Sequence, residues 1–336
     1  MTNLAIDGLI SSPSFLANFK NVLDGGDFTV NPWQRGTSFT GIANTLTYGA
    51  DRWFAVGGAS SSIAMSKQAN TDVAGLAQAL QFGRTNGNAN TAVINLGQVI
   101  ETADAIRLQG QPITLSFWVK GGANAPASIN VQVIAGTGTD QSAANLVAGA
   151  WTGQANVVSA TLAPTTISTR YAFTGTVPAN ATQLGVLISY TPTGTAGATE
   201  WLQFMGFQLE AGPAASVFEH RDIQVELEIC QRYFYQANEP AAGVVVAAGM
   251  ITGASNIVFE LNLPVQMRAA PTVTVATGSW RANIAGTATA TTISAGSTHT
   301  PNYLTINGTG STMTAGQASL LQGNGGAGNI QASADY

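Results

Sequence analysis

The stretch FMGFQLEAGPAASVFEHRDIQVELEICQRYFY, residues 204–235, decides the organisation of the chain, because it places a helix pattern between two regions of β-pattern. A Gly-Pro pair at 212–213 ends an apolar strand pattern, and Asp222 can then cap a helix by accepting from free N–H groups of its first turn. Apolar side chains follow at spacings of four, three and four, close to one stripe of an α-helix. They are Ile223, Leu227, Cys230 and Phe234. The pattern predicts a connecting helix within 219–236.

Strand patterns fill both flanks of this connector. Residues 24–218 contain short runs rich in β-branched and aromatic residues, separated by Gly, Asn, Pro and Thr turns. Runs of this spacing with few helix signals predict a two-sheet sandwich or jelly roll. Residues 237–336 predict a second β-sandwich domain, and no 20–50-residue repeat indicates a solenoid. The fold is therefore expected to be mainly β, with a leader helix at residues 1–23, where Ser12 and Pro13 form a helix start.

The composition narrows the class of protein. Charged residues make up 9% of the 336 residues, against about 25% in an average soluble domain. With three lysines and a net charge of −5, the chain has no basic patch for phosphates, which argues against nucleic-acid binding. No apolar run approaches the roughly 20 residues that cross a bilayer, and the N-terminus lacks a signal-peptide pattern. We expect a protein made in a cytoplasm without a leader and used as an extracellular or fibrous viral protein.

One cysteine excludes an intrachain disulfide and a cysteine-based zinc site. Cys230 is expected to be a buried thiol on the apolar helix face. The oxygen-rich loop at 24–27 is an alternative Ca²⁺ site, although the required ligands are not all present in the pattern. We therefore predict neither a metal nor a cofactor.

The sequence contains few groups for catalysis. It has two histidines and none of the common hydrolase, zinc-protease or nucleotide-binding motifs. The densest carboxylates belong to the connector and are expected to form a solvated face or pair between chains: Glu219, Asp222, Glu226 and Glu228. We predict a protein that is not an enzyme. A dyad assembled from single residues such as Asp51, Glu101 or Asp140 remains open.

Sugar binding is the better-supported chemistry, since aromatic, amide and hydroxyl side chains are abundant. Candidate residues are the tryptophans in predicted loops or at strand ends, together with two polar aromatics near Pro301. They are Trp33, Trp53, Trp151, Trp280, His299 and Tyr303. For each single tryptophan a core position is the favoured alternative, because tryptophan is mostly buried. From Ala282 to Ala334 there is no charged residue, which suits a tightly packed oligomeric tip.

Three segments resemble bacteriophage tail-fibre and other virion receptor-binding proteins. FEHRDIQVELEICQRYFY resembles their "PFExR…EL…CQRYY" segment, with Val217 in place of a proline and Phe234 where a second tyrosine often stands. GGDFTVNPWQRGTSF resembles their "NGDFxxWQRG" opening, and LPVQMRAAPTVTV their "FPVxMRAAPTVT" strand pair. The matching connector residues are Phe218, Glu219, Arg221, Glu226, Leu227, Cys230, Gln231, Arg232 and Tyr233.

The resemblance implies a jelly roll similar to carbohydrate-binding modules, a connecting helix and a distal β-domain, assembled as a trimer. The expected function is a virion fibre or spike protein that binds host-surface polysaccharide and contacts other virion proteins through residues 1–23. A capsid decoration protein is the alternative, and a polysaccharide depolymerase has less support. The expected oligomer interface consists of Ile223, Leu227, Cys230, Arg232 and Phe234.

Overall fold

The computed structural model describes residues 20–276, 278–310 and 313–336. The predicted leader helix falls mostly on residues 1–19 and so lies outside the described residues. The chain divides into two compact units, one reaching to Glu226 and including Tyr336, the other spanning Leu227–Asp335.

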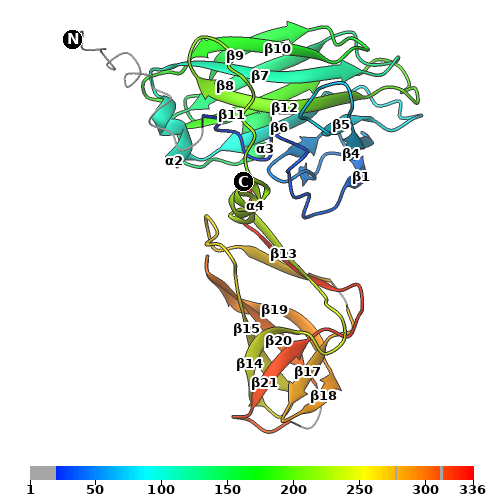
Figure 1. Ribbon diagram of the computed structural model, residues 1–336, viewed down its shortest axis with the longest axis vertical. Helices are drawn as coiled ribbons and strands as arrows, with labels where there is room; N and C mark the ends of the chain where they lie inside the picture. The colour runs from blue at the N-terminus through cyan, green and yellow to red at the C-terminus, as the bar shows by residue number, and fades with distance from the viewer. Residues whose placement is uncertain (1–19, 277, 311–312) are drawn as a thin grey trace, which may run out of the picture. The chain divides into compact units, whose positions relative to one another are not determined.

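The first unit is a sandwich of two six-stranded antiparallel sheets, drawn from blue to green in Figure 1. Sheet A has the order β1 (Ser38–Ile42), β4 (Ile63–Ala69), β5 (Gln78–Arg84), β12 (Leu202–Ala211), β7 (Pro112–Gly121), β10 (Thr169–Thr176). Sheet B has the order β2 (Thr47–Tyr48), β3 (Phe54–Val56), β6 (Ile94–Ile100), β11 (Gln183–Tyr190), β8 (Ile129–Gly136), β9 (Ala155–Leu162). The chain passes from one sheet to the other after β1, β3, β5, β6, β7, β9, β10 and β11, as in a jelly roll. The predicted mainly β fold with an N-terminal sandwich is confirmed.

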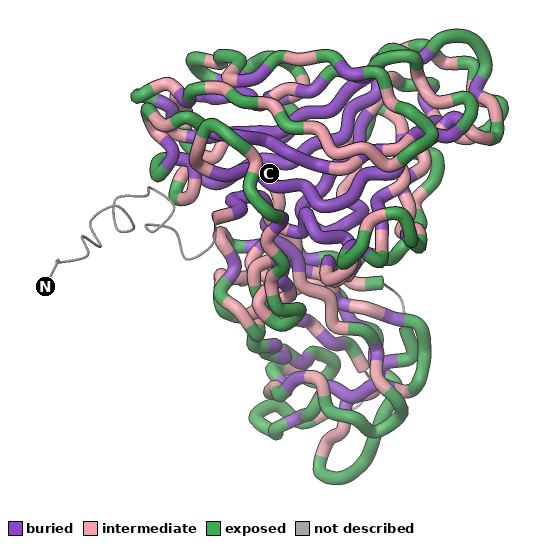
Figure 2. Tube along the Cα trace, turned by 45° about the horizontal axis from the view of Figure 1, so that its top comes forward, coloured by how far each residue is buried: buried purple, intermediate pink, exposed green. Residues whose placement is uncertain are grey.

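Alternation along the strands builds the core of this unit. In β7, Ile113, Leu115, Phe117 and Val119 are fully buried between the sheets, while Trp118 lies on the opposite face and is partly exposed. This is the period of two that a strand imposes on its side chains. Figure 2 shows buried residues along the strands and exposed ones in the turns between them. The core therefore follows from the apolar alternation visible in the sequence.

Short helices close parts of the sandwich: α2 (Thr102–Ala105), the 3₁₀ turn η2 (Ile106–Leu108) and α3 (Ala143–Val147). The Ser142 side chain caps α3 by accepting from the Asn145 N–H. Leu146 of α3 and Trp151 form an apolar cluster with Val99, Ile134 and other residues on the outer face of sheet B. That part of the outer face is consequently closed to ligands.

The connecting helix exists but is shorter than predicted. Helix α4 spans Ile223–Gln231, and Asp222 caps it, since its carboxylate accepts from the Gln224 N–H at 2.8 Å. Phe234 was expected on the helical stripe, and this is wrong: it begins strand β13 and is 3% exposed. Phe234 pairs with Ser333 in a β-ladder. This pairing ends the helix, although the apolar spacing continues to Phe234.

The second unit contains two sheets around one apolar core, drawn mostly from yellow to red in Figure 1. Sheet C has the order β13 (Phe234–Asn238), β22 (Asn329–Ser333), β16 (Thr272–Ala276). Sheet D has the order β18 (Thr287–Ala290), β17 (Arg281–Ile284), β21 (Ala318–Gln322), β14 (Val245–Gly253), β15 (Asn256–Asn262), β20 (Tyr303–Thr309), β19 (Thr292–His299). Within the described part of the chain, no helix has the length and apolarity needed to cross a membrane.

Candidate functional site

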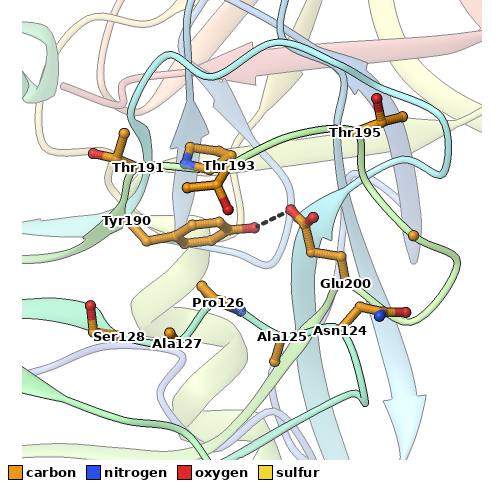
Figure 3. Close-up of a pocket in the computed structure, with 12 residues that line it drawn as sticks. Asn124, Ala125, Pro126, Ala127, Ser128, Tyr190, Thr191, Thr193, Thr195 and Glu200 are labelled. Carbon is orange, nitrogen blue, oxygen red and sulfur yellow. Dashed lines mark hydrogen bonds between the residues drawn. The ribbon is translucent and has the colours of Figure 1, made fainter.

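A polar cavity of about 500 Å³ opens at one end of the sandwich in the first unit. It is bordered by the chain connections that follow β7 and β11, where the two sheets are joined. Figure 3 shows its lining residues. They are Asn124, Ala125, Pro126, Ala127, Ser128, Tyr190, Thr191, Pro192, Thr193, Thr195, Gly197 and Glu200. The volume lies within the range of small-ligand pockets, about 300–1,000 Å³.

Arg84, the last residue of β5, holds the rim of this cavity in place. Its side chain is buried and donates from Nε and Nη2 to the two carboxylate oxygens of Glu200, at 2.7 Å each. Its Nη1 donates to the backbone carbonyls of Asn88 (3.0 Å), Asn90 (2.8 Å) and Gly194 (2.9 Å). The hydrogen bond to Glu200 raises the pKa of Arg84, so the guanidinium stays charged. One side chain thus fixes the loops after β5 and β11 together.

Tyr190 completes the wall next to this ion pair. Its phenol O–H lies 3.4 Å from Glu200 Oε1, and Figure 3 shows the ring pointing at that carboxylate. Burial, with Glu200 nearby, raises the pKa of Tyr190, so the phenol remains a protonated donor. Glu200 is the one carboxylate among the residues lining the cavity, and Arg84 neutralises it. A glycosidase needs two carboxylates about 5–9.5 Å apart. The arrangement suits binding of an uncharged polar ligand.

A row of polar side chains begins beside the cavity on the outer face of sheet B. Asn95 lies opposite Ser189, Ser189 opposite Asn130, and Asn130 opposite Thr161 in the strand register. Asn130 and Thr161 are exposed, whereas Asn95 and Ser189 are 8% and 6% exposed. Asn130 and Ser189 are each two residues from a cavity-lining residue, Ser128 and Thr191. Cavity and row together form the candidate functional site.

None of the residues of this site was predicted from the sequence. Its amides and hydroxyls look like ordinary strand residues until the register aligns them across sheet B. The signal that could have revealed the row is the alternation in INVQV and GVLISY, in which polar residues share one face with Leu187.

The tryptophans predicted to bind sugar are core residues instead. Trp33, Trp53, Trp151 and Trp280 are 4%, 0%, 3% and 2% exposed. Three indole N–H groups donate to backbone carbonyls, Trp33 to Phe28, Trp53 to Gly25 and Trp151 to Ser142. A buried indole cannot stack on a sugar, so the favoured alternative of a core position holds for each of them.

His299 and Tyr303 lie together in the β19–β20 hairpin of the second unit, and both are partly buried. Burial lowers the pKa of His299, which favours the neutral imidazole. Their role in ligand binding stays a prediction.

Two of the connector carboxylates, Glu219 and Glu226, are structural within the first unit, whereas Glu228 is exposed. Glu219 accepts from the backbone N–H groups of Lys20 (3.2 Å) and Asn21 (2.9 Å). Glu226 is 2% exposed and accepts from the Gly25 N–H and from Arg221 Nη1. The expected solvated or interchain position is wrong for Glu226, because it pairs inside its own chain. These residues of the FExR…E motif tie the connector to the opening segment of the unit.

Two of the residues considered for a catalytic dyad are engaged separately. Asp51 accepts from the Gln34 N–H (2.8 Å) and Arg35 Nη1 (3.4 Å), and Asp140 accepts from the Thr102 N–H (2.9 Å). Glu101 is 5% exposed, and none of the three lines the cavity.

The loop at 24–27 holds two acids that have cationic or imidazole partners. Asp24 pairs with Arg52 at 3.2 Å and Asp27 with His220 at 2.9 Å. Among the described residues, no group of three or more His, Cys, Asp or Glu could hold a metal ion.

The predicted interface residues divide into exposed and buried ones. Ile223 is 53% exposed, and Leu227 and Arg232 are partly exposed. Cys230 and Phe234 are 1% and 3% exposed within the single chain, so they offer no surface to a sister copy. The prediction of an interface is corrected for these two residues by their burial.

Comparisons with known proteins give weak likenesses. No family model matches the chain, and no curated protein matches it. A solved family 4 carbohydrate-binding module is 17% identical, covering 48% of this chain and 88% of its own, with a TM-score of 0.31. TmCBM61 in complex with β-1,4-galactotriose is 11% identical, with coverage of 58% and 100% and a TM-score of 0.34. The enzymatically active domain of bacteriophage CBA120 tailspike protein 4 is 10% identical, with coverage of 60% and 22% and a TM-score of 0.34. Each is a protein to which this chain is distantly similar.

Proposed function

We propose that the chain is a subunit of a virion fibre or spike that binds a host-surface polysaccharide and does not cleave it. The observation that carries the proposal is the cavity of about 500 Å³, whose one lining carboxylate, Glu200, is neutralised by Arg84, continued by the row Asn95–Ser189–Asn130–Thr161. Sugars present many hydroxyl groups and often no charge, so neutral amide and hydroxyl side chains match them. The resemblance of three sequence segments to phage receptor-binding proteins supports the virion assignment.

The polar row is expected to contribute directly to polysaccharide affinity. Replacing Asn130 and Thr161 together with alanine removes two exposed hydrogen-bonding side chains without touching the core. Each hydrogen bond contributes about 0.5–1.5 kcal/mol, so we expect Kd for host-surface polysaccharide to rise roughly 5- to 100-fold. Isothermal titration calorimetry on the full chain measures the change.

The control is Thr174→Ala, an equally exposed threonine on the sheet A strand β10. Equal affinity of the double variant and the control would remove sheet B from the binding site. Release of soluble oligosaccharides during incubation would contradict the non-enzymatic part of the proposal and favour a depolymerase.

The trimer is proposed on exposed apolar surface in addition to the sequence resemblance. In the second unit, Met250 and Val258 face one another across β14 and β15 and are 54% and 37% exposed. Leu320 on the neighbouring strand β21 is 39% exposed. Together with Ile223 of α4, these side chains give apolar area that association would remove from water.

Ile223→Asp is expected to dissociate the oligomer, since it places a carboxylate in an interface that packs an isoleucine. Light scattering should give three times 34.4 kDa for the native chain and 34.4 kDa for the variant. Gln224→Asp, the exposed neighbour on the same helix, is the matched control. A native chain that scatters as a monomer would contradict the trimer.

A further inference from the structure

The second unit contains a seam where sheet D rolls back on itself. Strands β18 and β19 are consecutive in the chain, yet they form opposite edges of the seven-stranded sheet. Thr291 alone joins them. Its N–H donates to the Trp280 carbonyl at 3.0 Å, and its hydroxyl donates to the Thr309 carbonyl at 2.8 Å. Thr291 therefore fastens the start of β17 to the end of β20.

A cavity of about 400 Å³ opens at this seam. Its walls come from the chain before β17, from the β18–β19 junction, from the end of β20 and from the loop after β21. The polar residues that matter for recognition are Ser279, Thr292, Thr309 and Asn324. The mouth of a closed or nearly closed sheet is a common position for a ligand site.

Glu239 does not line the cavity, but its carboxylate holds the backbone of the cavity wall in place. It is 8% exposed, and its carboxylate accepts from the backbone N–H groups of Ser279 (2.9 Å), Asn324 (3.0 Å), Gly326 (3.0 Å) and Gly328 (3.2 Å). Burial alone would raise the pKa of Glu239, but the amide donors outweigh it and hold the pKa below its usual value. The Glu239 carboxylate therefore positions the wall, and its oxygens already accept hydrogen bonds from backbone N–H groups.

The two backbone segments around Glu239 come so close to its carboxylate that each needs a glycine. A Cβ added at Gly278 would lie 2.2 Å from Glu239 Oε2, and one added at Gly326 would lie 2.7 Å from it. Glycine at these positions therefore lets two segments close around one carboxylate. The result is a shaped wall and not a loose turn.

The groups left over at the cavity are neutral donors and acceptors. The side chains of Ser279, Thr292 and Asn324 make no hydrogen bond within the described residues, and the Trp280 indole N–H is buried with no acceptor there. No ionisable side chain lines the cavity. An anion would find no counter-charge, and an apolar ligand would cover the hydroxyl and amide groups of Ser279, Thr292 and Asn324 without giving them partners, which is unfavourable.

We infer that the seam cavity is a second ligand site, independent of the one in the first unit, which takes a single sugar residue or a similar uncharged polyhydroxyl group. Ser279, Thr292 and Asn324 would supply hydrogen bonds to hydroxyl groups. Each chain would then carry one site in each unit, and simultaneous use of both would raise avidity on a polysaccharide surface.

Saturation-transfer NMR on the full chain tests the site, with the methyl α-glycosides of glucose, galactose, mannose and N-acetylglucosamine as probes. We expect at least one probe to receive saturation in the native chain and in the first-unit double variant Asn130→Ala/Thr161→Ala. Its signal should fall at least about fivefold when Thr292→Trp, which fills the cavity from an exposed position, or Asn324→Ala is added to that double variant. Asn256→Ala, an exposed asparagine on β15 away from the cavity, is the control and should leave the signal unchanged.

The outcomes separate this inference from the proposed function. A signal that survives when Thr292→Trp is added to the first-unit double variant, or the absence of signal for every probe, overturns the seam site. Loss of signal in the first-unit variant with an unchanged signal in Thr292→Trp would assign all sugar binding to the sandwich and equally overturn it. Retention of the far-UV spectrum and of the Asn256→Ala signal shows that the variants are folded.

Discussion

Replacing Arg84 with alanine is expected to destabilise the first unit by about 3–5 kcal/mol, because it leaves the Glu200 carboxylate buried without its partner. The side-chain exposures of Arg84 and Glu200 are 0% and 9%, so water compensates little. The carbonyls of Asn88, Asn90 and Gly194 lose a donor at the same time. Urea unfolding followed by tryptophan fluorescence measures the loss, since Trp280 is the one tryptophan outside this unit.

Two comparisons make the result specific. Arg107→Ala breaks an exposed pair with Asp104, whose side chains are 40% and 41% exposed, and should cost no more than about 1 kcal/mol. Arg84→Met combined with Glu200→Gln removes both charges and should recover part of the stability. If Arg84→Ala and Arg107→Ala have the same midpoint, Arg84 does not hold the loops as described. Even where the double variant folds, it should bind polysaccharide less well, because the cavity rim loses its carbonyl clamp.

The sequence predicts the sandwich because its strands alternate visibly. Ile113-Thr-Leu-Ser-Phe-Trp-Val119 reports which residues face the core, and the structure buries those residues. The sequence also predicts the start of α4 at Asp222, because a helix cap is formed by residues that are neighbours in the chain. Helix α3 was missed because its five residues are too few to show a period. Local pattern was therefore sufficient for the long alternating strands and for the start of α4.

The candidate site could not be predicted by the same means. The pair Arg84–Glu200 joins residues 116 positions apart, and the row Asn95–Ser189–Asn130–Thr161 depends on which strands become neighbours. Pairing of distant strands is not encoded in any single segment. The prediction that tryptophans bind sugar failed for a different reason. Their predicted loop positions suggested exposure, whereas Trp53 packs on Phe207 in the core with ring centroids 4.5 Å apart. Loop position in the sequence is thus a poor guide to exposure of a large aromatic residue.

Arg221→Ala is expected to destabilise the first unit by about 3–5 kcal/mol near neutral pH, because Glu226 then keeps a buried charge without its guanidinium. Arg221 also lies 3.6 Å from Asp24 and donates to the Asn21 carbonyl. Its loss therefore weakens the attachment of the connector at several points. Chemical unfolding of the full chain provides the measurement.

The pH dependence of this variant distinguishes an electrostatic cause from lost packing. Burial, together with Asp24, raises the pKa of Glu226 against the opposing effect of Arg221, so removing Arg221 raises that pKa further. For an acid with a raised folded-state pKa, stability falls as pH rises from the unfolded value through the folded value. The deficit of Arg221→Ala relative to the native chain should therefore shrink between about pH 8 and about pH 5, as Glu226 becomes protonated.

A double-mutant cycle completes the test of the connector. Arg221→Ala combined with Glu226→Gln removes the buried charge together with its partner, so most of the lost stability should return and the pH dependence of the deficit should disappear. Arg221→Lys keeps a positive charge but loses the planar fork that reaches Glu226, Asp24 and the Asn21 carbonyl, and should be intermediate. A deficit that is the same at both pH values and unaffected by Glu226→Gln would show that Arg221 acts through packing alone. In that case the FExR…E motif would not be an ion-paired anchor, and its presence in this chain would need another physical reason.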